Sequence, residues 1–208
     1  MKKYLLYNLF TLIIFIMLLF YVGNGQETAL DSFLINKLAF LDTYMAFFRV
    51  ITNFGSEPVI ITGTLLLLVW LWVDKKNYMA MTIVVLAVGG GNVFNQWLKN
   101  IISRERPIGH TYEGYSFPSG HAMLGLLFYG VVFYFLANQL KNTSVRIGLK
   151  ISLIAIIVLT GLSRIPLREH YPTDVLAGFA IGFSYLVVNI IIYEIWMFRW
   201  KNKRPGTF

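Results

Sequence analysis

The sequence is distinguished first by what it lacks. It contains no cysteine, which excludes thiol chemistry and thiolate metal sites and leaves the redox compartment open. Charged residues make up only 13% of the chain and hydrophobic residues 57%. A soluble protein of this size could not cover its surface with so few charges. The basic residues, which give a formal net charge of +8, form no continuous stripe, so we expect no nucleic-acid partner.

Long apolar runs predict an all-α integral membrane protein that forms a single domain, residues 1–208. A membrane-spanning helix needs about 20 apolar residues, and the chain offers six such runs: 4–22, 58–73, 78–98, 119–138, 146–163 and 173–196. The first could instead be a secretory signal, but its length and the absence of an A-x-A cleavage pattern favour a span. The sequence therefore predicts a bundle of six transmembrane helices.

The segment 27–56 is expected to lie on the membrane rather than across it. Its apolar residues recur at steps of three and four, which predicts one or two amphipathic helices in the interface. This segment could guard a lipid entry site or could simply be a connector. Two glycine patterns, Gly89-Gly90-Gly91 and the pair Gly178 and Gly182, predict close packing between spans.

The distribution of basic residues predicts the topology. If six spans alternate, eleven Lys and Arg lie on the side of both termini and seven on the other side. The positive-inside rule then places both termini in the cytoplasm. Lys99 ends the third predicted span, His121 begins the fourth and Arg164 ends the fifth. We therefore expect one site on the extracytoplasmic face of the cell membrane.

Three cations and one helix start suit a phosphate group. Lys99, Arg106 and Arg164 carry charges that do not titrate near neutral pH, and guanidinium groups bind phosphate oxygens through two hydrogen bonds. Ser119 is a good N-cap residue, and Gly120 after it allows a phosphate to approach the free N–H groups of the helix. A single arginine near the membrane surface usually only extends its side chain to the lipid headgroups. Several arginines on one face instead favour a pocket that binds an oxyanion.

Two of the three histidines lie in these clusters and could carry out catalysis. His170 precedes Asp174 by four residues, so the pair would share a face if the turn is helical. A carboxylate on one ring nitrogen leaves the other free to attack phosphorus, and His121 could protonate the leaving group. His110 has no such partners, and we expect it to be solvated. We expect no metal, because the cations would oppose a divalent ion and the sequence has neither H-E-x-x-H nor an acidic pair.

These residues resemble the three motifs of the type 2 phosphatidic acid phosphatase superfamily. Lys99-x6-Arg106-Pro107 is similar to the first motif, Pro118-Ser119-Gly120-His121 to the second and Ser163-Arg164-x5-His170-x3-Asp174 to the third. The size and expected topology are most similar to the bacterial phosphatidylglycerophosphate phosphatases and undecaprenyl pyrophosphate phosphatases within that superfamily.

The resemblance implies hydrolysis of a lipid phosphate without cofactor or metal, through a phosphohistidine on His170. It gives Asp174 the role of orienting that histidine and His121 that of leaving-group acid. Lys99, Arg106, Ser119, Gly120 and Arg164 would hold the phosphate, and inorganic phosphate would leave on the outer face. Phosphatidylglycerophosphate, phosphatidate and undecaprenyl pyrophosphate are the expected substrates. The alternative is a lipid-phosphate carrier or transporter without hydrolysis, and the oligomeric state is not indicated.

Overall fold

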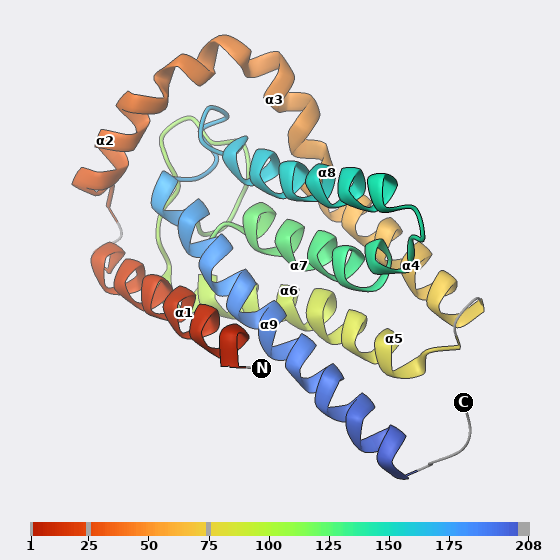
Figure 1. Cartoon of the computed structure of the whole chain (residues 1–208). Coiled ribbons are helices and arrows are strands. Elements are labelled where there is room, and N and C mark those ends of the chain that lie inside the picture. The colour runs from red at the N-terminus through yellow and green to blue at the C-terminus, as the bar shows by residue number, and fades with distance from the viewer. Residues whose placement is uncertain (1, 24–25, 74–75, 204–208) are drawn as a thin grey trace.

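The described part of the chain is helical. The computed structural model describes residues 2–23, 26–73 and 76–203. The α-helices in this part are α1 (Lys2–Val22), α2 (Ala29–Leu38), α3 (Met45–Ile51), α4 (Glu57–Val73), α5 (Tyr78–Val85), α6 (Gly91–Ile102), α7 (Gly120–Phe135), α8 (Thr143–Leu162) and α9 (Pro172–Lys203). Figure 1 shows the long helices gathered in one bundle, with α2 and α3 forming an arch at one end.

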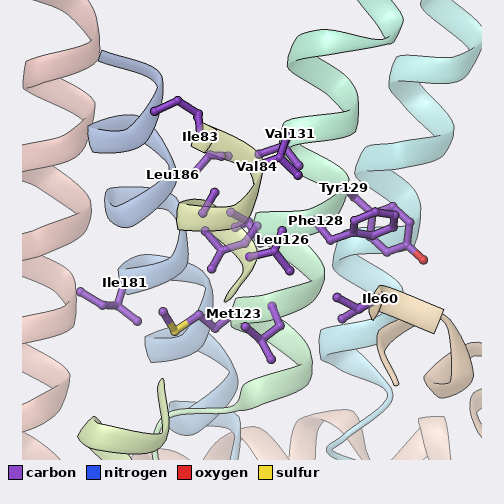
Figure 2. Close-up of a cluster of buried hydrophobic side chains, with 14 of the residues drawn as sticks. Ile60, Ile83, Val84, Met123, Leu126, Phe128, Tyr129, Val131, Ile181 and Leu186 are labelled. Carbon is purple, nitrogen blue, oxygen red and sulfur yellow. The ribbon is translucent and has the colours of Figure 1, made fainter. Parts of the chain in front are cut away.

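Helix α7 is the centre of the bundle, which explains its apolar composition. Ten of its sixteen residues are buried, including Met123, Leu127 and Val131. These side chains pack with residues of α5 and α9 such as Ile83, Val84 and Leu186 (Figure 2). Because most of α7 is buried against its neighbours, close packing fixes its position in the bundle.

Glycines set the distance between α7 and α9. A Cβ atom on Gly178 would lie 2.7 Å from the carbonyl oxygen of Ser119, and one on Gly182 would lie 3.2 Å from that of Met123. These approaches are too close for a larger residue at Gly178. The predicted packing role of this glycine pair is therefore confirmed.

The triple glycine lies at a break between two helices. Residues Leu86–Gly90 form a π-helical turn between α5 and α6. A Cβ atom on Gly90 would lie 2.7 Å from the hydroxyl oxygen of Tyr185, and that hydroxyl donates a hydrogen bond of 3.1 Å to the carbonyl oxygen of Leu86. The glycines thus let α9 reach the irregular turn and satisfy its backbone.

The all-α membrane fold is confirmed, whereas the number of six spans stays a prediction. Within the described ranges, four helices are long and apolar enough to cross a membrane: Tyr4–Val22, Tyr78–Ile102, Thr143–Leu162 and Pro172–Trp200. Helix α4 forms a fifth only if it is joined to 29–55 across a bend of 42°, and α7 is shorter, with 16 residues. A helix shorter than the bilayer core can lie in a bundle when its neighbours cover its ends.

The segment 27–56 is helical as predicted, but one residue of its polar face is buried. Phe33, Phe40 and Tyr44 are exposed by 56%, 61% and 57%, while Asp31 is fully buried. Asp31 faces inward because it accepts hydrogen bonds from the start of α9 and from a buried arginine. The placement of this segment in the membrane interface stays a prediction.

Candidate active site

The three sequence clusters meet at one end of the bundle, beside the arch of α2 and α3 (Figure 1). They surround a cavity of about 420 Å³. Six of the eight residues proposed from the sequence line this cavity: Lys99, Arg106, Gly120, His121, Arg164 and His170. The other two, Ser119 and Asp174, are fully buried behind it. Residues from three separate helices, α6, α7 and α9, and from the loops after α6 and α8 thus contribute to one site.

Ser119 builds the turn at the start of α7. Its hydroxyl oxygen accepts a hydrogen bond of 3.5 Å from the N–H of Ala122, as an N-cap residue does. Its own N–H donates to the carbonyl oxygen of Asp174 at 3.0 Å. Gly120 and His121 follow in the first turn, where backbone N–H groups have no intrahelical acceptor. The predicted helix start therefore points free N–H groups at the cavity, and Ser119 shapes it from behind.

Backbone and hydroxyl groups hold the three cations in position. The ammonium group of Lys99 donates to the carbonyl oxygen of Tyr115 at 2.6 Å, and Arg106 donates to that of Glu169 at 2.7 Å. Arg164 donates to the hydroxyl oxygen of Thr52 at 2.7 Å. Burial lowers the pKa of both guanidinium groups, and Glu169 opposes that shift. Arginine stays charged under such shifts, so the cavity wall is strongly positive.

Glu169 is a member of the site that the motif spacing did not reveal. Its carboxylate lies 3.8 Å from the guanidinium groups of both Arg106 and Arg164. Burial raises the pKa of Glu169, but hydrogen bonds from the hydroxyl and the N–H of Thr111, together with Arg164, lower it below its usual value. Glu169 thus fixes two phosphate-binding candidates and anchors the loop that contains Thr111.

His170 and Asp174 come together by a route that differs from the expected helical turn. Helix α9 begins only at Pro172, so His170 lies outside it, and the N–H of Tyr171 donates to Asp174 Oδ2 at 2.8 Å. Proline is favoured at the first position of a helix, and the residue before a proline avoids the helical conformation. The helix therefore does not extend back to His170. The loop still places His170 Nδ1 3.6 Å from Asp174 Oδ2. Ser116 also donates its hydroxyl to this carboxylate oxygen.

The surroundings of His170 keep its imidazole neutral. Burial and the positive charges of Lys99 and Arg106 lower the pKa of His170 to about 4, although Asp174 opposes the shift. With Asp174 beside Nδ1, the proton of the neutral ring is best placed on that nitrogen. Nε2 then carries the lone pair, and it lies 3.4 Å from Arg106 Nη1. The nitrogen available for attack therefore faces a group that can hold phosphate.

His121 lies across the cavity with a free ring nitrogen. Its Nε2 is buried and has no hydrogen-bond partner among the described residues. Gly55 makes room for the ring, since a Cβ atom there would lie 3.0 Å from His121 Cδ2. Tyr112 covers the site, with its ring centroid 6.2 Å from that of His121 and 4.8 Å from the guanidinium carbon of Arg164. His110 is exposed, as expected.

The donors in the site do not resemble a metal centre. In the ranges that the structure describes, no group of three or more His, Cys, Asp or Glu is placed to hold a metal ion.

Arg104, like Glu169, is a residue beside the site that the sequence interpretation did not include. It donates to Asp174 Oδ1 at 2.6 Å. Its position two residues before Arg106 gave no signal, because a buried arginine and an exposed one look alike in sequence.

Comparisons with known proteins identify relatives of this chain and a solved structure with a similar fold. Phosphatidylglycerophosphatase B of Bacillus subtilis is 31% identical over 157 residues, covering 73% of this chain and 76% of the relative. Undecaprenyl-diphosphatase of Sulfolobus acidocaldarius is 30% identical over 209 residues, covering 91% and 93%. The crystal structure of a transmembrane PAP2-type phosphatidylglycerolphosphate phosphatase from Bacillus subtilis superposes with a TM-score of 0.77 at 26% identity, covering 90% of this chain and 96% of that one.

The family model of the PAP2 superfamily matches residues 80–203, more than half of the chain and the whole of the cavity except the segment around Gly55. The motif resemblance, the relatives and the fold therefore lead to one conclusion: the chain is a multi-pass membrane protein that belongs to the PAP2 superfamily, the type 2 phosphatidic acid phosphatases.

Proposed function

We propose that the protein hydrolyses lipid phosphates without a metal, through a covalent phosphohistidine on His170. One observation carries the proposal: His170 lines a cavity whose wall carries Lys99, Arg106 and Arg164, and its Nε2 lies 3.4 Å from Arg106 Nη1. Three fixed cations supply the charge neutralisation that a metal would otherwise give to a phosphoryl group. A carrier that only binds a headgroup has no need of the His170–Asp174 pair.

The chemistry can be assigned to named atoms. The phosphate binds to the three cations and to the N–H groups of Gly120 and His121. The lone pair of His170 Nε2 attacks phosphorus while the bond to the leaving oxygen breaks, and that oxygen takes a proton from His121 Nε2. Asp174 stabilises the positive charge that develops on His170. The negative charge of the bound phosphate favours the protonated form of His121 that this step requires.

The second half of the reaction reverses these roles. His121, now neutral, takes a proton from a water molecule as that water attacks the phosphorus of the phosphohistidine. The nitrogen–phosphorus bond breaks, its electron pair returns to His170 Nε2, and inorganic phosphate that carries the water oxygen leaves the cavity. Ser119 contributes by forming the turn, and its hydroxyl oxygen caps α7. A direct contact of that hydroxyl with the phosphate stays a prediction.

The substrate is a membrane lipid that carries a phosphomonoester or a pyrophosphate. The relatives are named for phosphatidylglycerophosphate and undecaprenyl diphosphate, which agree in the phosphate and differ in the lipid. The cationic wall of the cavity binds only the phosphate group, so phosphatidate is a third candidate substrate. Phosphate release from all three lipids in detergent, with chelator present, is the decisive measurement. Absence of release from each of them, or release that requires added zinc or magnesium, would refute the proposal.

The site is proposed to face away from the cytoplasm, as the distribution of basic residues predicts. The start of α1 and the end of α9 lie at the other end of the bundle from the cavity, which supports placing both termini on the opposite side (Figure 1). A cysteine placed in loop 108–116 should react with an impermeant thiol reagent in intact cells, because the native chain has no cysteine to compete. Labelling that occurs only after lysis would invert the topology.

A further inference from the structure

Arg104 is a fully buried arginine in the loop after α6 that lies outside the cavity. Its Nη1 atom donates to Asp174 Oδ1 at 2.6 Å and to the hydroxyl oxygen of Thr173 at 2.8 Å. Its Nη2 atom donates to Asp31 Oδ2 at 2.6 Å and to the carbonyl oxygen of Gln26 at 3.0 Å. A buried charge with four hydrogen bonds is held in one orientation, so it can define the positions of its partners.

The first partner is the carboxylate beside His170. With Oδ1 of Asp174 taken by Arg104, only Oδ2 is left for the ring nitrogen of His170, for the hydroxyl of Ser116 and for the N–H of Tyr171. Each oxygen therefore has a separate set of donors. The plane of the carboxylate, and with it the line of approach to His170, follows from where the guanidinium group lies.

The second partner ties this arrangement to α2. Asp31 Oδ1 accepts from the N–H of Thr173 at 2.9 Å and from its hydroxyl at 2.7 Å. The same aspartate closes the capping box of α2 with Thr28. Arg104 thus lies between two fully buried carboxylates, Asp31 and Asp174. Without its charge they would both remain buried with no cation between them, which is a strongly unfavourable arrangement.

We infer that Arg104 is a positioning residue for catalysis: by holding Asp174 Oδ1 it aims Asp174 Oδ2 at His170, and through Asp31 it fixes this pair to α2. The inference rests on the proposed phosphatase function and deepens it. Arg104 does not line the cavity, so it acts on the nucleophile and not on the bound phosphate. Its loss should lower kcat and leave KM close to the wild-type value.

The experiment separates positioning from folding by using a double variant. Arg104→Met alone leaves two buried carboxylates and should lower the thermal stability in detergent. Arg104→Met with Asp31→Asn removes one of those charges and should regain most of the lost stability. If Arg104 positions Asp174, kcat of this double variant stays about 10- to 100-fold below wild type, as expected for a misplaced reacting group.

Arg49→Met is the matched control, because it removes an exposed arginine from α3, on the same side of the molecule. If the wild type and this control release no phosphate from any lipid, the proposed function fails. If both are active and the double variant recovers kcat together with stability, Arg104 is only structural and the inference fails. A rise in KM at unchanged kcat would also overturn it.

Arg104→Lys gives a second test in case the double variant does not fold. Lysine keeps the positive charge, but its compact ammonium group lacks the planar fork that joins Asp31 and Asp174. The inference expects near-normal stability and KM with kcat between those of the wild type and the Arg104→Met variant. A kcat equal to that of the wild type would overturn it.

Discussion

The contact between α7 and α9 leads to a prediction that links a single methyl group to the rate of the reaction. In Gly178→Ala, the new Cβ atom would lie 2.7 Å from the carbonyl oxygen of Ser119 and 3.0 Å from Ala122 Cβ, whereas ordinary contact begins at 3.4 Å. The two helices must therefore separate by about 0.7 Å at this point. The hydrogen bond from Ser119 N–H to the carbonyl oxygen of Asp174 crosses the same contact, so the separation reaches the site directly.

The size of the effect follows from two opposing terms. Overpacking costs typically about 1–3 kcal/mol, while alanine in place of glycine favours a helix by roughly 1 kcal/mol. The two terms leave a net loss of stability of about 0–2 kcal/mol. The rate should fall much more, because displacing reacting groups by about 1 Å can lower it by about 100-fold. We expect Gly178→Ala to lose at least about tenfold in kcat on that scale.

Gly148→Ala is the matched control, because Gly148 lies in α8 and a Cβ atom there would meet nothing within 4 Å. Gly148→Ala should gain the stability that alanine gives to a helix, without a steric clash. Both variants are compared by thermal unfolding in detergent and by phosphate release from the same lipid. If Gly178→Ala matches Gly148→Ala in kcat, the spacing of α7 and α9 does not set the geometry of the site.

Two further predictions concern the histidines. His170→Ala should abolish turnover of lipid and aryl phosphates alike. His121→Ala should lose about 10²–10⁴-fold in activity on a lipid phosphate and far less on nitrophenyl phosphate, because the acidic phenol leaves without protonation. If His121→Ala loses both activities equally and His170→Ala keeps the aryl activity, the two roles are exchanged. The acid limb of kcat/KM, corrected for ionisation of the substrate, should have its midpoint near pH 4, because the pKa of His170 is lowered to about 4 and protonation below it removes the attacking lone pair. A midpoint at or above the usual value of 6.5 would contradict the neutral nucleophile.

Much of the architecture was accessible from the sequence because its causes are local. Apolar runs predict helices wherever a membrane is the solvent, and the glycine pair in α9 predicts close packing from residue size alone. The spacing of Lys99, Arg106, His121, Arg164 and His170 identified residues that the structure brings to one cavity. Consecutive spans run in alternating directions, so the position of each residue at the start or the end of its span tells at which end of the bundle it lies. That is sufficient to infer that these residues share one site.

The parts that escaped prediction depend on partners far away in the chain. Asp31 follows the polar period of an amphipathic helix, yet it is buried because Arg104, which is 73 positions away, donates to it. Glu169 lies within a motif but acts through Arg106 and Arg164, and its role appears only when the loops meet. Local pattern describes which face of a helix is apolar, and it does not tell which charged groups will find each other inside the fold.

The π-helical turn at Leu86–Gly90 has a consequence for how the length of the chain can vary. Buried positions run along one face from Ala80 through Val84 and Ala87 to Asn95 and Lys99. A regular α-helix turns by about 100° per residue, so the 19 steps from Ala80 to Lys99 would overshoot that face by one residue. The wider turn absorbs this surplus residue. Gly89, which meets nothing within 4 Å, lies where it is absorbed. Deletion of one residue at this point would therefore leave a regular α-helix in which the lysine remains directed at the cavity.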